Sequence, residues 1–248
     1  GGIFYCYVIS FYIRLVHFVV VNPSFIFKLV AYGIPRSKIT YIPNFVDDAK
    51  FHPVDELEKR RLKTKWGIAQ QRFVVVGSGQ IQERKGVFDF IQLAEQNPDV
   101  QFIWAGGFSF GRITDGYAAL KKIVDNPPVN LKFPGIVSRQ EIAELDNIAD
   151  LFLLPSYNEL FPMSVLEAFS CGTPVMLRDL DLYHSIIQGY YEPAKDVDEM
   201  QQKLDWLQKT PARLAELKMA AHTASRQYSK SHLAKVWHQF YLEQAKEG

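Results

Sequence analysis

The stretch from residue 151 to 177 constrains the fold more than any other, because it predicts a complete strand–helix–strand unit. Leu151–Leu154 is an uninterrupted apolar run of strand length, which is typical of a strand buried on both faces. Ser164 and Glu167 have the spacing of a capping box at the start of a helix, and Val175 begins another apolar run. Such a unit indicates an α/β fold with a Rossmann-like parallel sheet, helices on both faces and right-handed crossovers.

Two carboxylates flank the predicted start of this helix. Glu159 lies in the loop after the strand, and Glu167 lies in the first turns of the helix. Open α/β sheets bind ligands at the carboxyl ends of their strands, where a helix N-terminus favours phosphate. Because carboxylates are strong hydrogen-bond acceptors, this pair is suited to holding the hydroxyl groups of a sugar or a ribose. The alternative is that Glu167 only caps its helix and Glu159 is a solvated loop charge.

A second candidate for ligand binding follows another predicted strand. Phe73–Val76 is apolar and leads into a glycine-rich turn that contains Gly79, and a helix is predicted from Val87. The backbone N–H groups of such a turn can hold a phosphate, and Arg84 and Lys85 would add positive charge. The alternative is a tight strand-to-helix turn whose basic residues are solvated.

Three segments resemble glycosyltransferase family 4, a group of retaining enzymes with the two-lobed GT-B fold. Residues 159–168 and 171–175 match its E-x7-E signature, residues 42–47 its I-P-N-G-V-D hinge, and residues 77–86 its glycine-rich phosphate loop. The chain departs from the usual residues of these segments at Phe45, Gln80 and Leu160. The resemblance implies that the predicted sheet is the C-terminal, donor-binding half of a GT-B fold.

The resemblance also implies a reaction, the transfer of a hexose from a nucleotide sugar with retention at the anomeric carbon and with no assigned covalent nucleophile. By similarity, Glu159 holds the hydroxyl groups of the hexose and Glu167 those of the ribose. Arg84 and Lys85 stabilise the diphosphate leaving group as negative charge develops on it. The other donor-binding residues that it implies are Gly79 in the phosphate loop, Val137 beside the nucleobase, and Phe161, Pro162, Met163 and Ser164 at the helix start.

No cofactor is expected, because the nucleotide-sugar donor, UDP-glucose by resemblance, is a substrate. No metal is expected either. Asp179 and Asp181 form a D-x-D pair, which binds a divalent ion with the nucleotide in glycosyltransferases of the other major fold. Here the pair follows the wrong strand for that role and is interpreted as a helix cap and loop. A further capping box is predicted at Ser138 and Glu141.

The resemblance divides the chain into four parts. Residues 1–43 are expected to be the remnant of an N-terminal acceptor lobe, residues 44–53 the hinge, and residues 54–228 the Rossmann-like donor-binding domain. Residues 229–248 are expected to form a helix that crosses back to the N-terminal lobe, with a partly exposed apolar stripe. The chain is therefore expected to be the donor-binding part of an enzyme and catalytically incomplete by itself.

Four short segments look like those of Gram-positive diacylglycerol glucosyltransferases, namely residues 82–91, 102–104, 130–135 and 178–183. This likeness implies that the acceptor is a diacylglycerol or a glycosyl-diacylglycerol. It also implies a cytoplasmic protein that is peripheral on the inner face of the cell membrane. Two alternatives stay open: the acceptor is a soluble sugar, a polysaccharide or a protein, or the chain is a nucleotide-sugar-binding module without catalysis.

Composition adds limits of its own. The 248 residues carry a formal net charge of +1, which shows no basic footprint, so no nucleic-acid partner is predicted. Two cysteines far apart in the chain, Cys6 and Cys171, favour a reducing compartment over a disulfide scaffold. Residues 3–21 are strongly apolar but are interrupted by Arg14 and His17, which predicts a helix to His17 and then a buried strand. A helix on a membrane surface is the alternative for this segment.

Overall fold

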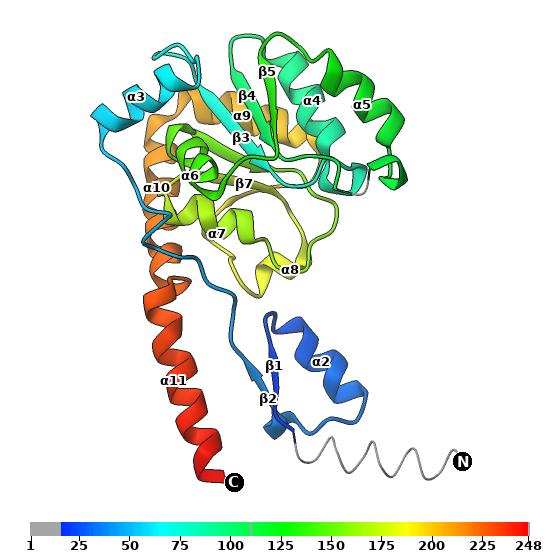
Figure 1. Ribbon diagram of the computed structural model, residues 1–248, viewed down its shortest axis with the longest axis vertical. Helices are drawn as coiled ribbons and strands as arrows, with labels where there is room; N and C mark the ends of the chain where they lie inside the picture. Colours follow the sequence, from blue (N-terminus) through cyan, green and yellow to red (C-terminus); the bar gives the residue numbers. More distant parts are fainter. Residues whose placement is uncertain (1–15, 110, 248) are drawn as a thin grey trace.

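The computed structural model describes residues 16–109 and 111–247, and most of them form a parallel sheet with helices on both faces (Figure 1). The sheet has six strands in the order β5-β4-β3-β6-β7-β8, and every neighbouring pair is parallel. The strands are β3 (Val74–Ser78), β4 (Gln101–Ala105), β5 (Leu131–Gly135), β6 (Leu151–Leu154), β7 (Val175–Arg178) and β8 (Glu192–Ala194). The predicted fold class is confirmed.

The helices of this domain are α3 (Glu56–Lys65), α4 (Val87–Gln96), α5 (Tyr117–Asp125), α6 (Arg139–Ile148), α7 (Met163–Ser170), α8 (Asp181–His184), α9 (Val197–Lys209) and α10 (Pro211–Gln227). From α3 to α9 they alternate with the strands along the chain, as expected for a doubly wound sheet, and α10 follows α9 directly. Within the described residues this domain also has two short 3-10 helices, η2 (Glu83–Lys85) and η3 (Gly111–Ile113), and a third, η1 (Arg36–Lys38), precedes the domain.

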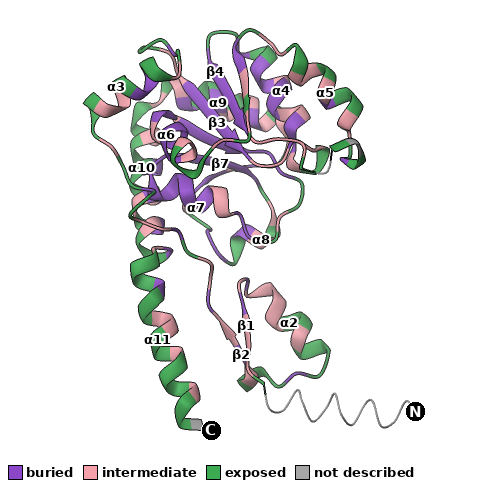
Figure 2. Cartoon of the chain, in the orientation of Figure 1, coloured by how far each residue is buried: buried purple, intermediate pink, exposed green. Residues whose placement is uncertain are grey.

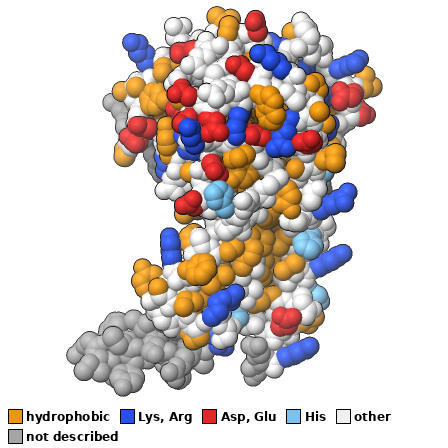
Figure 3. Space-filling view, turned by 180° about the vertical axis from the view of Figure 1, so that it is seen from behind, with side chains coloured by type: hydrophobic (Ala, Val, Ile, Leu, Met, Phe, Trp, Pro, Cys, Tyr) orange, Lys and Arg blue, Asp and Glu red, His pale blue; other side chains and the backbone are white. Residues whose placement is uncertain are grey.

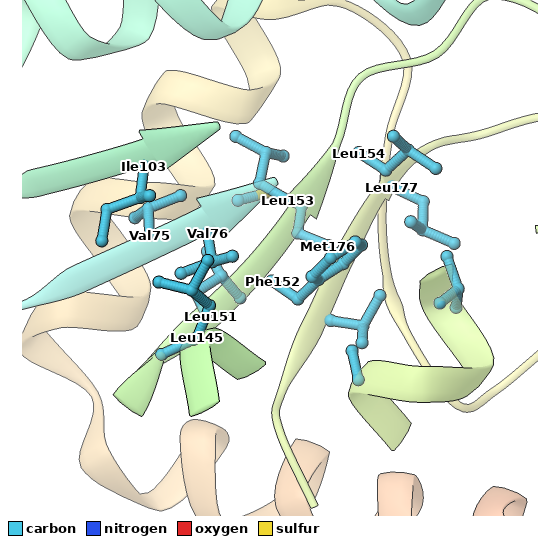
Figure 4. Close-up of a cluster of buried hydrophobic side chains, with 14 of the residues drawn as sticks. Val75, Val76, Ile103, Leu145, Leu151, Phe152, Leu153, Leu154, Met176 and Leu177 are labelled. Atoms are coloured by element: carbon cyan, nitrogen blue, oxygen red, sulfur yellow. The ribbon is translucent and has the colours of Figure 1, made fainter. Parts of the chain in front are cut away.

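The core lies on both faces of the central strands, where every residue of β3, β4, β6 and β7 is buried (Figure 2). Continuous apolar strands are stable here because helices cover the sheet from either side. Figure 4 shows side chains of neighbouring strands packed together, among them Val76, Ile103 and Phe152, with Leu145 of α6 against them. This packing fixes the carboxyl ends of the strands, where the candidate site lies.

A smaller unit lies below the sheet in the view of Figure 1. Its strands β1 (Phe18–Val20) and β2 (Ile39–Tyr41) are parallel and are connected through α2 (Ser24–Ala31) and η1. The last helix, α11 (Lys230–Glu247), reaches this unit, since the rings of His17 and Phe240 lie 5.2 Å apart. The strand expected after His17 is present as β1, but only its last residue, Val20, is buried. The helix expected before it and Cys6 lie outside the described residues.

The connection between the two units is tied to the start of α11. Val46 N–H donates to the Tyr228 carbonyl over 2.9 Å, and Lys230 N–H donates to the Val46 carbonyl over 2.8 Å. The chain therefore enters the large domain, and leaves it, at the same place.

Apolar side chains are exposed on the lower part of the molecule, where Figure 3 shows hydrophobic groups gathered. Phe27 of α2 is 78% exposed, and Tyr241 of α11 is 63% exposed. The partly exposed stripe predicted for the last helix is therefore present. None of the helices in the described residues combines the length and the apolar character needed to cross a membrane.

Two predicted helix caps are wrong and one is right. Ser138 and Glu141 form the expected capping box, with Glu141 N–H donating to Ser138 Oγ over 3.2 Å. Ser164 and Glu167 do not form one, because α7 begins at Met163 without a side-chain cap and the Glu167 carboxylate has another partner.

The aspartate pair of the D-x-D segment does not cap α8 either. This helix follows Leu180, which cannot accept a hydrogen bond through its side chain. Asp179 instead accepts a hydrogen bond from the Tyr191 hydroxyl at 3.0 Å and lies 2.8 Å from His184 Nε2. Asp179 therefore belongs to local loop structure, as the loop part of the interpretation expected, whereas Asp181 is the first residue of α8.

Candidate active site

Two loops meet at the carboxyl ends of the neighbouring strands β3 and β6. The first loop contains η2 and Lys85, and the second contains Glu159. Lys85 Nζ lies 2.5 Å from Glu159 Oε1, and their side chains are only 16% and 6% exposed. The structure therefore brings together two residues that lie far apart in sequence and that were predicted to share one site.

Arg84 joins the same two loops through its backbone and its side chain. Its carbonyl accepts a hydrogen bond from Tyr157 N–H at 2.9 Å and one from Ser156 Oγ at 3.2 Å. Its guanidinium donates to the Asn158 carbonyl over 2.5 Å. Because a guanidinium carries five N–H donors, this contact leaves others for a ligand. Gln80, which stands where the family usually has arginine, accepts instead from Gln82 Nε2 at 2.7 Å.

Glycines allow the two loops and their neighbours to approach backbone to backbone. Gly86 has φ +71°, and a Cβ there would lie 2.1 Å from the Pro155 carbonyl oxygen. Gly106 has φ +149°, and a Cβ there would lie 1.8 Å from the carbonyl oxygen of Gly79. That same oxygen accepts a hydrogen bond from Trp104 Nε1 at 3.1 Å. The packing at Gly86 and at Gly106 therefore leaves no room for a larger residue.

The start of α7 lies directly after the Glu159 loop. Phe161 and Pro162 are buried, and the Phe161 ring packs edge to face on Tyr228 with the centroids 6.3 Å apart. Met163 N–H donates to the Phe161 carbonyl over 3.0 Å, so the backbone of this predicted donor-binding residue is already hydrogen-bonded. Ser164 is half-buried.

Glu167 is the second carboxylate of the candidate site, and its side chain is only 6% exposed. Its Oε1 lies 2.6 Å from a guanidinium nitrogen of Arg139. The guanidinium carbon of Arg139 lies 4.8 Å from the centroid of the Phe51 ring. Burial raises the pKa of Glu167, and the positive charge of Arg139 opposes that rise. Val137, the predicted nucleobase contact, is half-buried two residues before Arg139.

Two charged residues of this region were missed by the sequence analysis. Arg139 had a usable signal, because it follows the predicted base contact at the start of a helix. Asp146 had no such signal, because an aspartate in a predicted amphipathic helix is expected to lie on its solvent-exposed face. It is 1% exposed, and neither carboxylate oxygen has a hydrogen-bond partner within residues 16–109 and 111–247. Burial, and next the charge of Glu167, raise the pKa of Asp146 well above its usual range.

Metal binding has no evident location in the part of the chain that the structure describes, where no three His, Cys, Asp or Glu side chains gather as ligands. The sequence-based expectation of a metal-independent site stays a prediction. Cys171, also expected at a buried helix end, is there as a free thiol.

Comparison with known proteins identifies the family to which the chain is similar. Residues 58–226 match the family described as Glycosyl transferases group 1. The chain is 56% identical over 247 residues to alpha-galactosylglucosyldiacylglycerol synthase of Streptococcus pneumoniae, an alignment that covers 100% of this chain and 66% of that protein. It is 32% identical over 162 residues to the processive diacylglycerol alpha-glucosyltransferase of Acholeplasma laidlawii, covering 64% of this chain and 46% of that one.

The chain thus spans 66% or less of the length of these two relatives. Among solved structures, Anabaena Alr3699/HepE in complex with UDP and glucose superposes with a TM-score of 0.78 at 18% identity. That superposition covers 92% of this chain and 62% of the other, and at this identity it supports the GT-B fold alone. With most of its length matched by one family and the predicted fold observed, the chain belongs to the Glycosyl transferases group 1 family.

Proposed function

We propose that this chain is the donor-binding part of an enzyme that transfers a hexose from a UDP-hexose to a glycolipid acceptor built on diacylglycerol. The observation that carries the proposal is the pairing of Lys85 with Glu159 at 2.5 Å, where the loops after β3 and β6 meet. The name of the 56% identical relative, a galactosylglucosyldiacylglycerol synthase, supports the acceptor class.

The donor fits this site through the groups that the two loops present. Lys85 and Arg84 neutralise the diphosphate, and charge stabilisation of the leaving group lowers the barrier to its departure. When the diphosphate takes over Lys85, the Glu159 carboxylate is released to accept hydrogen bonds from the hexose hydroxyls. Glu167 accepts from the ribose hydroxyls. The remaining donor contacts in this proposal are Gly79, Val137, Phe161, Pro162, Met163 and Ser164.

Retention and the identity of the hexose belong to the same proposal. Both relatives carry "alpha" in their names, and an alpha product from an alpha-linked nucleotide sugar requires retention. Glucose is the hexose expected from the sequence, whereas the name of the Streptococcus relative favours galactose added to glucosyl-diacylglycerol. A lipid acceptor also implies that the full-length protein works at a membrane surface.

The test is transfer by the full-length protein from radiolabelled UDP-glucose and UDP-galactose. Acceptors are diacylglycerol and glucosyl-diacylglycerol in detergent micelles, and free glucose as the soluble alternative. We expect lipid product only, and we expect Glu159→Ala to lower turnover at least about 100-fold while UDP affinity stays within a few-fold of wild type. Glu216→Ala is the control, because Glu216 is an exposed helix residue paired with Arg213.

Each alternative has its own result. Product on free glucose alone would replace the lipid acceptor by a soluble one. Binding of UDP-hexose without transfer to any acceptor would favour the non-catalytic module. Normal turnover by Glu159→Ala would remove the central residue of the proposal.

A further inference from the structure

The loop that carries Glu159 is held by an arginine that lies outside the E-x7-E segment. Arg178 is the last residue of β7, and its side chain is 9% exposed. Its Nε donates to the Pro155 carbonyl over 3.0 Å, and its Nη1 donates to the Lys195 carbonyl over 3.0 Å. One guanidinium therefore ties the end of β7 to the first residue of the Glu159 loop.

The same guanidinium makes two further contacts. Its Nη2 forms an ion pair with Asp89 of α4, and its central carbon lies 4.1 Å from the centroid of the Tyr157 ring. The Tyr157 hydroxyl in turn donates to Asp89 over 2.8 Å. Arg178 thus contacts the face of the Tyr157 ring, and Asp89, which Arg178 also binds, accepts from the Tyr157 hydroxyl. A buried guanidinium over an aromatic face is a favourable contact.

We propose that Arg178, acting through Pro155 and Tyr157, is a positioning residue that sets the place of the Glu159 carboxylate. The inference rests on the proposed function, in which Glu159 holds the transferred hexose. Only one residue separates Tyr157 from Glu159, and that residue, Asn158, is bound through its carbonyl to Arg84. The loop is therefore fixed before and after Tyr157.

Positioning of this kind matters because a reacting geometry tolerates little displacement. A shift of about 1 Å from a change away from the reacting atoms can lower a rate on the order of 100-fold. The Glu159 loop has no helix or strand of its own between β6 and α7, so its shape depends on these side-chain contacts. Lysine cannot replace Arg178, because a single ammonium cannot reproduce a planar fork that also stacks on a ring.

The experiment uses the full-length protein with Tyr157→Phe and Arg178→Lys. Tyr157 is half-exposed, so Tyr157→Phe removes one hydroxyl contact without opening the core. We expect kcat to fall between about 10- and 100-fold in each variant, with UDP affinity within two-fold of wild type. We also expect the extra affinity for UDP-hexose over UDP to be lost. Tyr241→Phe and Arg213→Lys are matched controls on α11 and α10, where neither residue contacts the site loops.

A double variant separates positioning from a general effect on folding. If Tyr157 acts through Glu159, adding Tyr157→Phe to Glu159→Ala lowers kcat no further. A further drop of similar size in the double variant, or an unchanged kcat in both single variants while Glu159→Ala is inactive, would refute the positioning role. Normal activity of Glu159→Ala itself would instead refute the proposed function, so the two failures are distinguishable.

Discussion

Replacing Asp146 by asparagine should make the protein more stable at neutral pH. Asp146 is buried in α6 with no hydrogen-bond partner for its carboxylate in the described residues, and its pKa is raised well above the usual range. A carboxyl with a raised pKa binds its proton more tightly in the folded than in the unfolded state. Its ionisation therefore opposes folding as the pH rises above the unfolded pKa of about 4.

The size of the effect follows from the same linkage. Each pH unit between the unfolded and the folded pKa lowers the free energy of unfolding by about 1.4 kcal/mol. Asparagine has the same shape and no ionisable proton, so it escapes this loss. An asparagine amide would be as unpartnered as the protonated carboxyl, so the gain comes from the linkage alone. We expect Asp146→Asn to gain about 1.4 kcal/mol or more at pH 7 and almost none at pH 4.

Urea unfolding between pH 4 and pH 8 measures this difference. Asp150→Asn is the matched control, because Asp150 accepts from Val74 N–H at 3.0 Å and from Lys59 Nζ at 3.2 Å. That variant should lose about 1–3 kcal/mol at pH 7. If Asp146→Asn were less stable than wild type at pH 7, or if its gain did not grow between pH 4 and pH 7, Asp146 would have a stabilising partner and the reasoning would fail.

Three further predictions concern the loops and the donor. Gly86→Ala should lower the free energy of unfolding by at least about 2 kcal/mol, because a Cβ would meet the Pro155 carbonyl at 2.1 Å in a left-handed backbone. Gly189→Ala is the control, at φ +85° with no described atom within 4 Å, and its free energy of unfolding should fall by less in the same urea titration. Arg139→Gln should raise the pKa of Glu167 further, because the Arg139 charge opposes its rise. The loss of UDP affinity at acid pH, measured by calorimetry, should therefore begin at a higher pH than in the wild type. An unchanged pH dependence would count against the proposal that Glu167 binds the ribose. Manganese or a chelator should leave transfer unchanged, and strict metal dependence would contradict the expected metal-free site.

The positions of strands and helices were predictable because they depend on short-range patterns. The apolar runs at β3 and β6, the glycines after β3 and the polar loop after β6 each lie within about ten residues. Since parallel strands present their carboxyl ends at one edge of a sheet, the residues after β3 and β6 could be placed in one site before the structure was known. The expectation that Lys85 and Glu159 share a site followed from the family resemblance.

Which side chains pair with one another was decided by the tertiary structure. The spacing of Ser164 and Glu167 suits a capping box, yet Glu167 pairs with Arg139, because α6 and α7 pack against each other and bring the guanidinium within 2.6 Å. Arg178 and Asp89 meet for the same kind of reason. By itself the sequence determined the elements and the edge that carries the site, because these depend on residues close in the chain. The partners of its buried charges depend on contacts between distant segments, which form only when the sheet assembles.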